Sequence, residues 1–353
     1  MLTQYSIAFD MIFVREVAMI RDIDLVVLWV NGDDPKWLEE RRRYEPEKDK
    51  VATNKSRFRD WGLMRYWFRG VEKNVDWYRY IFFVTYGHLP EWLNLDNERL
   101  RVVKHEDFIP QEYLPTYNSN VIELNLHRIK DLSKNFVLFN DDIFIVKKVE
   151  KTYFFKKKLP CDALYAKVLV NWSLDNYVWH MVFNNMGIIN RQFSGGKNNL
   201  KNFTKWVNSK YGKNALHNMF MMLFSRYSSF YDFHLPIPYD KDTFEEVWRL
   251  EGETLDKVCY NKFRTPFDIS HWLFRYWRMV KGEFCPTNVQ KFGSYYEFTN
   301  GIDDIISAIV SKDKSILVLN DAGCDNDIIF EEYRSRLTEA FEKVLSEKCS
   351  FEI

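Results

Sequence analysis

The chain has 353 residues, of which 46% are hydrophobic and 28% are charged, so it can bury a globular core. The 50 Lys and Arg residues balance the 50 Asp and Glu residues, and a net charge of zero argues against a general nucleic-acid-binding protein, which normally has a basic excess. Five widely spaced cysteines without a CxxC pair predict free thiols in a reducing compartment and give no zinc signature. No apolar run reaches the roughly 18–20 residues of a membrane span.

The first 150 residues alternate apolar runs with amphipathic segments. Apolar runs closed by Gly, Asn or Asp are typical of buried strands, and apolar side chains spaced three and four apart indicate helices. This pattern predicts strands at residues 24–30, 80–85, 100–103 and 136–146, and helices at residues 37–44, 62–74 and 121–132. Asp60 is the predicted N-cap of the helix at 62–74, and the polar residues 45–55 predict an exposed loop. Residues 5–20 predict an amphipathic helix, for which packing on its own domain and docking on a membrane both stay open.

The pattern changes after residue 150. Residues 151–232 predict a mostly helical insertion, with a loop over 193–199. The later elements are predicted helices at 243–248, 269–281 and 327–347 and a strand at 316–319. Alternating strands and helices predict an α/β fold, with a Rossmann-like, mainly parallel sheet, flanking helices and a largely helical insertion. We expect one domain over 1–353, with an N-terminal helical extension (1–22), an α/β core (24–150 and 233–353) and the insertion (151–232).

Two carboxylates lie in the middle of an apolar run. The sequence FVLFNDDIFIV carries Asn140, Asp141 and Asp142, although Asp is depleted in strands and costly to bury alone. One interpretation is a turn between two short strands. The other is a site that handles a cation, a proton or a substrate hydroxyl. Asn320 and Asp321 follow the strand predicted at 316–319 in the same way, and ligands of parallel sheets collect at such strand ends.

Four motif blocks follow one another along the chain. They are DLVVLWVNGDDPKW at 24–37, RFRDWGLMRYWFRG through VLFNDDIFI at 57–145, FHLPIPYDKD through RYWRMVKG at 233–282, and ILVLNDAGCDND with a C-terminal SFE at 316–352. With these blocks the chain resembles the Stealth family of sugar-phosphate transferases of bacterial capsule and surface-polysaccharide pathways. It is also similar to the catalytic core of the animal enzyme that adds GlcNAc-1-phosphate to lysosomal glycoproteins. In one departure, Gly62-Leu63-Met64 stands where some relatives have an acidic residue, so no role is assigned there.

The resemblance implies a reaction and its partners. A glycan hydroxyl attacks the β-phosphorus of a UDP-sugar, a sugar-1-phosphate (GlcNAc-1-phosphate or hexose-1-phosphate) is transferred, and UMP leaves. It implies a UDP-sugar donor, a lipid-linked or soluble glycan acceptor, and a cytoplasmic enzyme, with contact at the inner face of the bacterial plasma membrane left open. The alternatives are a metal-dependent glycosyltransferase that releases UDP and a non-catalytic carbohydrate-binding protein.

Phosphoryl transfer requires charge neutralisation, in-line positioning and a base. Asp141 and Asp142 are the candidates for the base, and Asp142 with Asn320 and Asp321 for the ligands of Mg²⁺ or Mn²⁺. The resemblance makes His234 a candidate acid, base or phosphate donor, and Arg264 a clamp for the diphosphate.

Further residues are candidates for substrate binding. Asn31, Gly32 and Asp34 are expected to shape the nucleotide pocket, Arg57, Arg59 and Arg65 to contact phosphate, Asn118, Ser119 and Asn120 to bind sugar hydroxyls, and His127 and Arg128 to face the donor. Each has a structural alternative: loop geometry for the first group, salt bridges with Asp60 or Glu72 for the arginines, an Asx or ST turn for the third group, and helix packing for the last.

Overall fold

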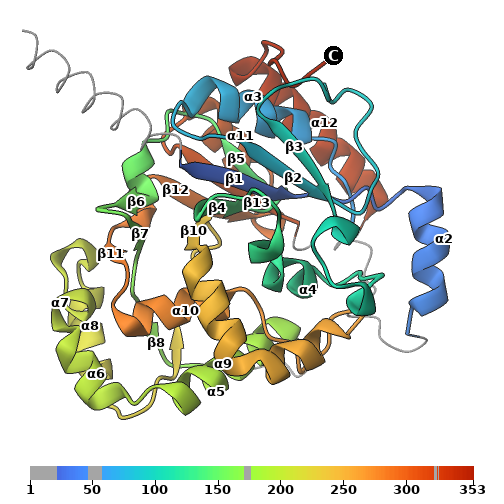
Figure 1. Ribbon diagram of the computed structural model, residues 1–353. Helices are drawn as coiled ribbons and strands as arrows, with labels where there is room; N and C mark the ends of the chain where they lie inside the picture. Colours follow the sequence, from blue (N-terminus) through green and yellow to red (C-terminus); the bar gives the residue numbers. More distant parts are fainter. Residues whose placement is uncertain (1–21, 47–57, 171–175, 322–323, 325) are drawn as a thin grey trace, which may run out of the picture.

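The computed structural model describes residues 22–46, 58–170, 176–321, 324 and 326–353 (Figure 1). The helix predicted over 5–20, most of the loop predicted over 45–55 and the candidate Arg57 lie outside these residues. All five cysteines are within them, and no disulfide joins any two. Of the helices that belong to the described residues, none is long and apolar enough to cross a membrane.

The central sheet has five strands in the order β10-β4-β1-β2-β3. They are β1 (Ile23–Leu28), β2 (Ile81–Thr85), β3 (Leu100–Lys104), β4 (Asn135–Phe139) and β10 (Ile237–Asp240). β1, β2, β3 and β4 are parallel, and β10 runs antiparallel to β4 at the edge. The predicted mainly parallel α/β fold is therefore confirmed.

Helices cover both faces of this sheet, and the strands are apolar on both faces for that reason. Leu25 and Val27 belong to one hydrophobic core, whereas Val26 between them belongs to a second. The helices are α3 (Met64–Asn74), α11 (Asp303–Ser311) and α12 (Asp327–Val344) on the first side, and α4 (Ser119–Leu124), α9 (Lys241–Cys259) and α10 (Trp272–Lys281) on the second. Figure 1 shows these two groups above and below the strands. A further helix, α2 (Pro35–Tyr44), follows β1.

The strand predicted over 136–146 is two strands that belong to different sheets. β4 ends at Phe139, and β5 (Ile143–Ile145) joins a second sheet with β12 (Gly293–Glu297) and β13 (Ile316–Asn320), in the order β12-β13-β5. Between them the chain turns, with the Ile143 N–H donating to the Asn140 carbonyl oxygen over 3.3 Å. The turn interpretation of Asn140-Asp141-Asp142 is thus confirmed.

Two helix predictions need correction. Asp60 does not cap α3, because the helix starts at Met64 and the Asp60 carboxylate instead accepts a 2.8 Å hydrogen bond from the Gly62 N–H. The helix predicted over 121–132 is shorter: α4 ends at Leu124, where the Asn125 side chain donates back to the Val121 carbonyl oxygen. A 3₁₀ turn follows at Leu126–Arg128.

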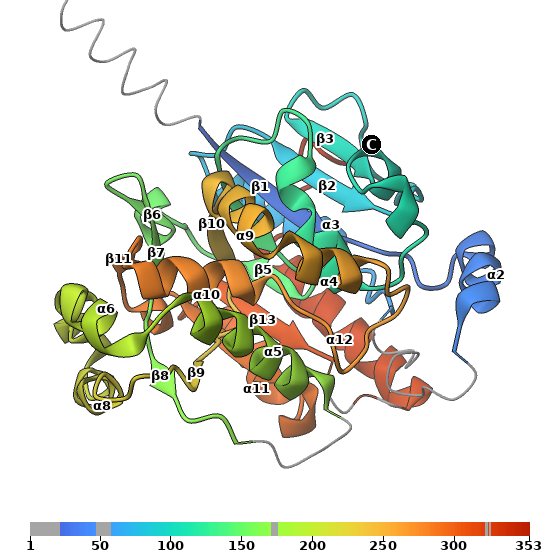
Figure 2. The ribbon, with the colours of Figure 1, turned by 60° about the horizontal axis from the view of Figure 1, so that its bottom comes forward.

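Residues 151–232 hold helices and short strands. The helices are α5 (Tyr177–Gln192), α6 (Gly195–Lys201), α7 (Phe203–Trp206) and α8 (Asn214–Met221), and the strands are β6 (Phe155–Lys156), β7 (Leu159–Asp162), β8 (Ala166–Lys167) and β9 (Ser229–Phe230). The predicted loop over 193–199 is wrong from Gly195 onward, where α6 begins. β7 also pairs with β11 (Cys285–Pro286). Figure 2 shows α5, α9 and α10 in front of the sheet, with α6 and α8 at the edge of the molecule.

Candidate active site

A cavity of about 510 Å³ opens at the carboxyl ends of the parallel strands. Leu28 at the end of β1, Val84 in β2 and Asn140 after β4 all line it. This is the edge at which parallel sheets bind ligands, because the loops that follow the strands meet there.

Strand pairing brings Asp141-Asp142 and Asn320-Asp321 into this one cavity. β13 runs antiparallel to β5, with Val318 opposite Ile143, so the end of β13 passes the start of β5. The Leu319 N–H donates a 2.8 Å hydrogen bond to the Asp142 carbonyl oxygen. Consequently Asn320 and Asp321 line the cavity together with Asp141 and Asp142.

The pairing of β10 places His234 beside the same turn. Ile237 lies opposite Leu138 in the antiparallel pair, so the chain three residues earlier lies beyond the end of β4, level with the turn. His234 Nε2 is 3.4 Å from Asp142 Oδ2, and His234 Nδ1 is 3.9 Å from Asp232 Oδ2. His234 also has φ of +55°, a left-handed conformation that is rare and strained for a residue other than Gly.

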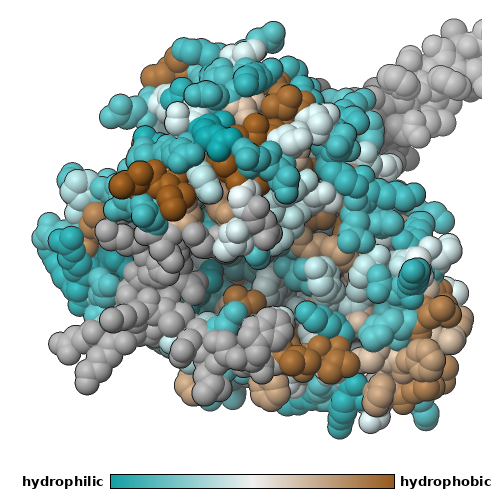
Figure 3. All heavy atoms as spheres, turned by 180° about the vertical axis from the view of Figure 1, so that it is seen from behind, coloured by the Kyte–Doolittle hydropathy of each residue, from teal (hydrophilic) through white to brown (hydrophobic). Residues whose placement is uncertain are grey.

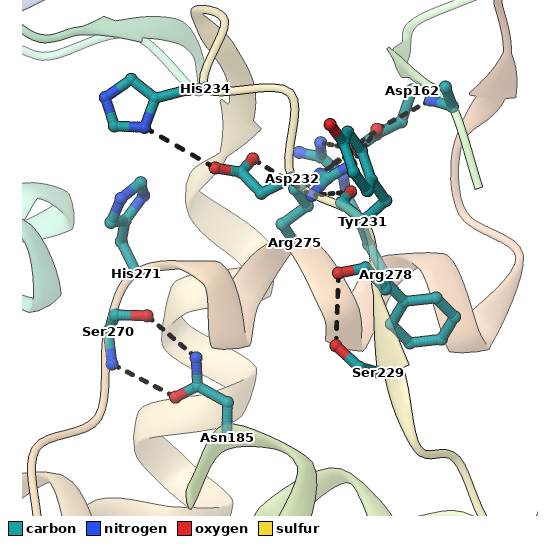
Figure 4. A network of polar contacts seen from close by, with 12 residues as sticks. Asp162, Asn185, Ser229, Tyr231, Asp232, His234, Ser270, His271, Arg275 and Arg278 are labelled. Atoms are coloured by element: carbon teal, nitrogen blue, oxygen red, sulfur yellow. Dashed lines mark hydrogen bonds and ion pairs between the residues drawn. The ribbon is translucent and has the colours of Figure 1, made fainter. Parts of the chain in front are cut away.

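Buried arginines of α10 hold the segment that carries His234 (Figure 4). Arg275 donates to Asp162 over 2.9 Å and to the Tyr231 carbonyl oxygen over 3.1 Å, and lies 3.4 Å from Asp232. Arg278 donates to Asp162 over 2.9 Å and to the carbonyl oxygen of Pro238. These contacts anchor the chain on both sides of His234, which is how the strained conformation can persist.

The charges around the turn shift two pKa values in directions that suit catalysis. The Asp141 side chain is exposed to solvent at the cavity. Partial desolvation by the cavity walls, followed by the negative charges of Asp142 and Asp60, raises its pKa to about 7. Burial alone would lower the pKa of His234, but the contact with Asp142 and the charge of Asp232 outweigh it and raise the pKa to about 9. At neutral pH His234 is therefore a cation, and Asp141 can gain or lose a proton.

A second buried acid faces the cavity from α4. Burial raises the pKa of Glu123 to about 7, against the opposing charges of Arg264 and His234. His271 Nε2 lies 3.6 Å from Glu123 Oε2, and burial lowers the pKa of His271 to about 3, so this ring is neutral. The Tyr239 hydroxyl fixes the ring, 2.8 Å from Nδ1 and 3.0 Å from the carbonyl oxygen of His271.

Arg264 and Arg59 both line the cavity, but they have different hydrogen-bond partners. Arg264 donates a 2.6 Å hydrogen bond to the Ser119 hydroxyl, and both side chains line the cavity. Arg59 makes a bidentate pair with Asp321, at 2.9 and 3.1 Å, rather than the expected pair with Asp60. The Arg59 pair neutralises Asp321, whereas the contact of Arg264 with a neutral hydroxyl leaves its charge available for a phosphate.

The structure brings most of the strongest candidates together. The cavity lining includes Arg59, Ser119, Asp141, Asp142, His234, Arg264, Asn320 and Asp321.

Other candidates have structural contacts and are absent from the described cavity lining. Asn118 and Asn120 both donate to the buried Asp268, His127 packs against Phe244 and Trp248, Arg128 lies over Trp248, and Arg65 lies over Trp92. In the loop after β1, the Asn31 N–H donates to His88, Gly32 packs against Phe58, and Asp34 caps α2.

An aromatic part of the cavity wall was not predicted. Trp37, Tyr117 and Phe263 form a small buried cluster, and Trp37 and Tyr117 line the cavity with His105. The Tyr117 hydroxyl and His105 Nδ1 are buried and have no hydrogen-bond partner among the residues that the structure describes. Buried polar atoms are normally paired, so these atoms are free to bind a ligand. No local sequence signal marks them, because the residues come from separate loops.

The carboxylate part of the cavity fits a hard divalent cation. Within the described part of the chain, Asp142 Oδ1 is buried without a hydrogen-bond partner, and the carboxylates of Asp60, Asp142 and Asp321 repel that of Asp141. Over the residues that the structure describes, no set of three His, Cys, Asp or Glu side chains forms a complete metal cage. Mg²⁺ does not need one, because it usually keeps waters and binds substrate phosphates with one or two carboxylates.

Comparison with known proteins identifies the family. Residues 21–49 match the model of Stealth protein CR1, conserved region 1, and residues 57–161 match that of Stealth protein CR2, conserved region 2. A capsular polysaccharide phosphotransferase WcwK of Streptococcus pneumoniae is 41% identical over 335 residues, covering 94% of this chain and 98% of the relative. The receptor polysaccharide phosphotransferase WefC of Streptococcus gordonii is 34% identical (95% and 100% covered), and the exopolysaccharide phosphotransferase cps2G of Lactiplantibacillus plantarum is 32% identical (94% and 96%). The chain therefore belongs to the Stealth family, and it is a transferase of the phosphotransferase type.

Proposed function

We propose that this protein transfers a sugar-1-phosphate from a UDP-sugar to a hydroxyl of a capsular or exopolysaccharide glycan, with release of UMP. The observation that carries the proposal is the composition of one cavity. It joins a carboxylate of raised pKa, Asp141, with the cations His234 and Arg264 and with an aromatic wall that has unpaired polar atoms. A nucleotide-sugar has the matching parts: a flat base, an anionic diphosphate and a reacting phosphorus.

The donor is assigned to this cavity. The uracil ring packs in the aromatic wall, where the Tyr117 hydroxyl and His105 Nδ1 are available for its polar edge. Arg264 and the His234 imidazolium bind the diphosphate, for which guanidinium and imidazolium groups are suitable charge-assisted donors. UDP-GlcNAc is the first donor to test, followed by UDP-Glc, UDP-Gal and UDP-ManNAc.

The acceptor is assigned to a second cavity of about 800 Å³, which shares His234 and Val178 with the first. Tyr231 and Tyr295 line it with partly exposed rings, and the Tyr295 ring contacts the edge of His234 at 5.5 Å between ring centroids. Exposed aromatic faces are suitable platforms for sugar rings. A glycan in this second cavity would present its hydroxyl at the junction, beside His234.

The reaction then uses residues at that junction. The acceptor hydroxyl oxygen attacks the β-phosphorus and its proton passes to the carboxylate of Asp141. The bond from the β-phosphorus to the bridging oxygen breaks, and UMP leaves with that oxygen. His234 and Arg264 stabilise the charge that develops on the phosphoryl oxygens. Asp142 keeps His234 protonated and in position.

We further propose that Mg²⁺ or Mn²⁺ is required. Asp142 Oδ1 and the Asn320 side chain would hold it, with Asp321 beside them in its pair with Arg59. The ion supplies positive charge to the diphosphate and the leaving group.

Product analysis tests this function. The purified protein is incubated with Mg²⁺, a capsular glycan acceptor and each UDP-sugar, and the released nucleotide is identified by chromatography. The proposal expects UMP from one preferred donor and a rate at least about 100-fold lower for His234→Gln and Arg264→Gln, because each removes a transition-state donor. Release of UDP in place of UMP would overturn it in favour of a glycosyltransferase.

The acceptor cavity has its own test. Replacing the ring of Tyr295 by Tyr295→Ser is expected to raise the KM for the glycan several-fold and to leave the KM for the donor unchanged. Ile328→Ser, which changes an exposed side chain elsewhere, is the control. A Tyr295→Ser enzyme with an unchanged acceptor KM would argue against this assignment.

A further inference from the structure

Helix α8 has a polar side chain on its buried face and apolar side chains on its exposed face. The side chain of Asn218 is fully buried and donates to the carbonyl oxygens of Leu164 and Trp206, while its own oxygen accepts from the Ala166 N–H. The helix is therefore attached to the protein through a buried polar residue, with Ala215 and Met221 packed partly buried against the core. Its other apolar side chains lie on the outside, where a helix of a globular protein normally carries its polar ones.

The outward residues form one continuous stripe. They recur at spacings of three and four, as expected for one face of a helix that continues into the turn after Met221. They are Leu216, Met219, Phe220, Leu223 and Phe224. Phe220 is 64% exposed and Leu223 is 82% exposed.

Neighbouring helices extend this apolar surface. Leu200 in α6 and Phe203 in α7 are also exposed, and both helices lie with α8 at one edge of the molecule. Figure 3 shows apolar residues gathered at the lower right, the region that α6, α7 and α8 occupy when Figure 1 is viewed from behind. Exposed apolar patches of this kind mark surfaces that contact another apolar phase or a partner.

The charge of the same segment has one sign. Residues 176–231 contain no Asp or Glu. Their basic residues are Arg191, Lys197, Lys201, Lys205, Lys210, Lys213 and Arg226. On the elements packed against the segment, Glu251 is paired with Arg191, Glu246 and Glu283 with Lys281, and Asp162 with Arg275 and Arg278. The segment that carries the exposed apolar surface of α6–α8 therefore has an excess of positive charge.

We infer that α6–α8 form a docking surface for an anionic lipid bilayer. Helices that lie in a membrane interface combine an apolar face, which enters the acyl boundary, with Lys and Arg, which bind anionic headgroups. Each basic side chain near an anionic membrane strengthens binding roughly fivefold, so several together select anionic over zwitterionic lipid. The excess of positive charge favours an anionic bilayer over a second copy of the chain, because a second copy would bring the same positive charge to the interface.

The surface formed by α6–α8 is connected to the second cavity. Asn218 connects α8 to Ala166, and the next residue, Lys167, lines the second cavity. Docking at α6–α8 therefore places that cavity near the headgroups, within reach of a glycan carried on a lipid. The docking inference rests on exposure and charge alone and stands whether or not the second cavity binds the acceptor.

Vesicle binding tests the inference with the full-length protein. Vesicles of phosphatidylglycerol with phosphatidylcholine are compared with vesicles of phosphatidylcholine alone by co-sedimentation. We expect binding to the anionic vesicles that weakens at least tenfold at 0.5 M NaCl, because salt screens the attraction. The double variant Phe220→Ser/Leu223→Ser and the charge variant Lys197→Glu/Lys201→Glu should each lose at least tenfold in vesicle affinity. Leu95→Ser, an exposed apolar residue outside the segment, should bind as the native protein does.

Three results would overturn the inference. The native protein could fail to bind anionic vesicles, or both variants could bind like the native protein while keeping its circular dichroism and melting temperature. Alternatively, light scattering could show a native dimer that Phe220→Ser/Leu223→Ser converts to a monomer, which would assign the surface to a second copy of the chain.

Discussion

His234 Nε2 lies 3.4 Å from Asp142 Oδ2, although 92 positions separate the two residues in sequence. The contact depends on two strand pairings: β10 with β4, which brings His234 to the end of β4, and β13 with β5, which fixes the turn that carries Asp142. Its main consequence is that His234 is a cation at neutral pH, suited to bind phosphate and unsuited to act as the base.

The pKa values predict the pH dependence of the reaction. Asp141, with a pKa raised to about 7, must be deprotonated to accept a proton, and His234, with a pKa raised to about 9, must be protonated to bind phosphate. We expect kcat/KM to rise as the pH passes about 7 and to fall above about 9. Initial rates between pH 5.5 and 10 measure this. In His234→Gln the fall near pH 9 should be absent from the residual activity, and an unchanged fall would assign it to another group.

Asp141→Asn is expected to inactivate the enzyme and to stabilise the fold. Because the folded-state pKa is raised above the usual 3.8, ionisation of Asp141 destabilises the folded protein, and this cost grows as the pH rises from about 3.8 and is complete above about 7. We expect Tm to rise by about 1–3 °C at pH 8, a modest amount because solvent in the cavity screens the charge, and by less at pH 5. Calorimetry at both pH values checks this, and a lower Tm at pH 8 would contradict the assigned repulsion.

Removal of divalent cations is expected to abolish transfer. EDTA should stop the release of UMP, and Mg²⁺ or Mn²⁺ should restore it, because the ion neutralises the diphosphate. Asp142→Asn should weaken the binding of Mn²⁺ in the presence of UDP by at least about tenfold, measured by calorimetric titration. Full activity in EDTA would contradict the cation requirement. Unchanged Mn²⁺ affinity in Asp142→Asn would contradict the assignment of Asp142 as a ligand.

The C-terminal SFE motif is expected to serve stability. Arg69 donates to Glu352 over 2.7 and 2.9 Å in a buried pair, which ties the end of the chain to α3. Glu352→Gln should lower the free energy of unfolding by about 1–2 kcal/mol, with little effect on kcat, since it leaves the buried Arg69 with only the partly exposed Glu342 as counter-charge. The contact lowers the pKa of Glu352, so the stabilisation is present above the usual pKa near 4.5 and is lost as the pH falls through the lowered value.

Urea denaturation measures this effect. The matched control is Glu39→Gln, which breaks an exposed pair with Arg43 and should cost less than about 0.5 kcal/mol. Equal effects of the two substitutions, or a large loss of kcat in Glu352→Gln, would contradict a purely structural role.

The sequence predicts the sheet better than it predicts the site. Apolar runs closed by Gly, Asn or Asp locate β1, β2 and β13, and a short apolar run locates β3, because buried parallel strands are recognisable locally. The sequence predicts the run 136–146 as one strand because apolar residues flank the turn on both sides. It predicts Asp60 as a cap, but Gly62, with φ of +69°, turns the chain before α3 starts.

The contacts of the site depend on partners that are distant in sequence. Asn118 donates a hydrogen bond to Asp268, 150 residues away, which explains Asn118 as a structural residue. No local sequence pattern reveals this contact. Arg59 likewise pairs with Asp321, 262 residues away, rather than with its neighbour Asp60. Asn and Asp residues at strand ends are a usable signal, since strand ends meet at one edge of a sheet, whereas no sequence signal marks the wall that contains Tyr117 and His105.

The fate of the β-phosphorus tests the central claim most directly. A UDP-sugar labelled with ³²P in the β-phosphate and with ³H in the sugar is converted by the native enzyme, and the polymer product is counted for both labels. The account predicts that both labels enter the polymer in the donor's own ratio, because the phosphorus moves with the sugar. A polymer with ³H and without ³²P, together with labelled UDP in solution, would contradict it.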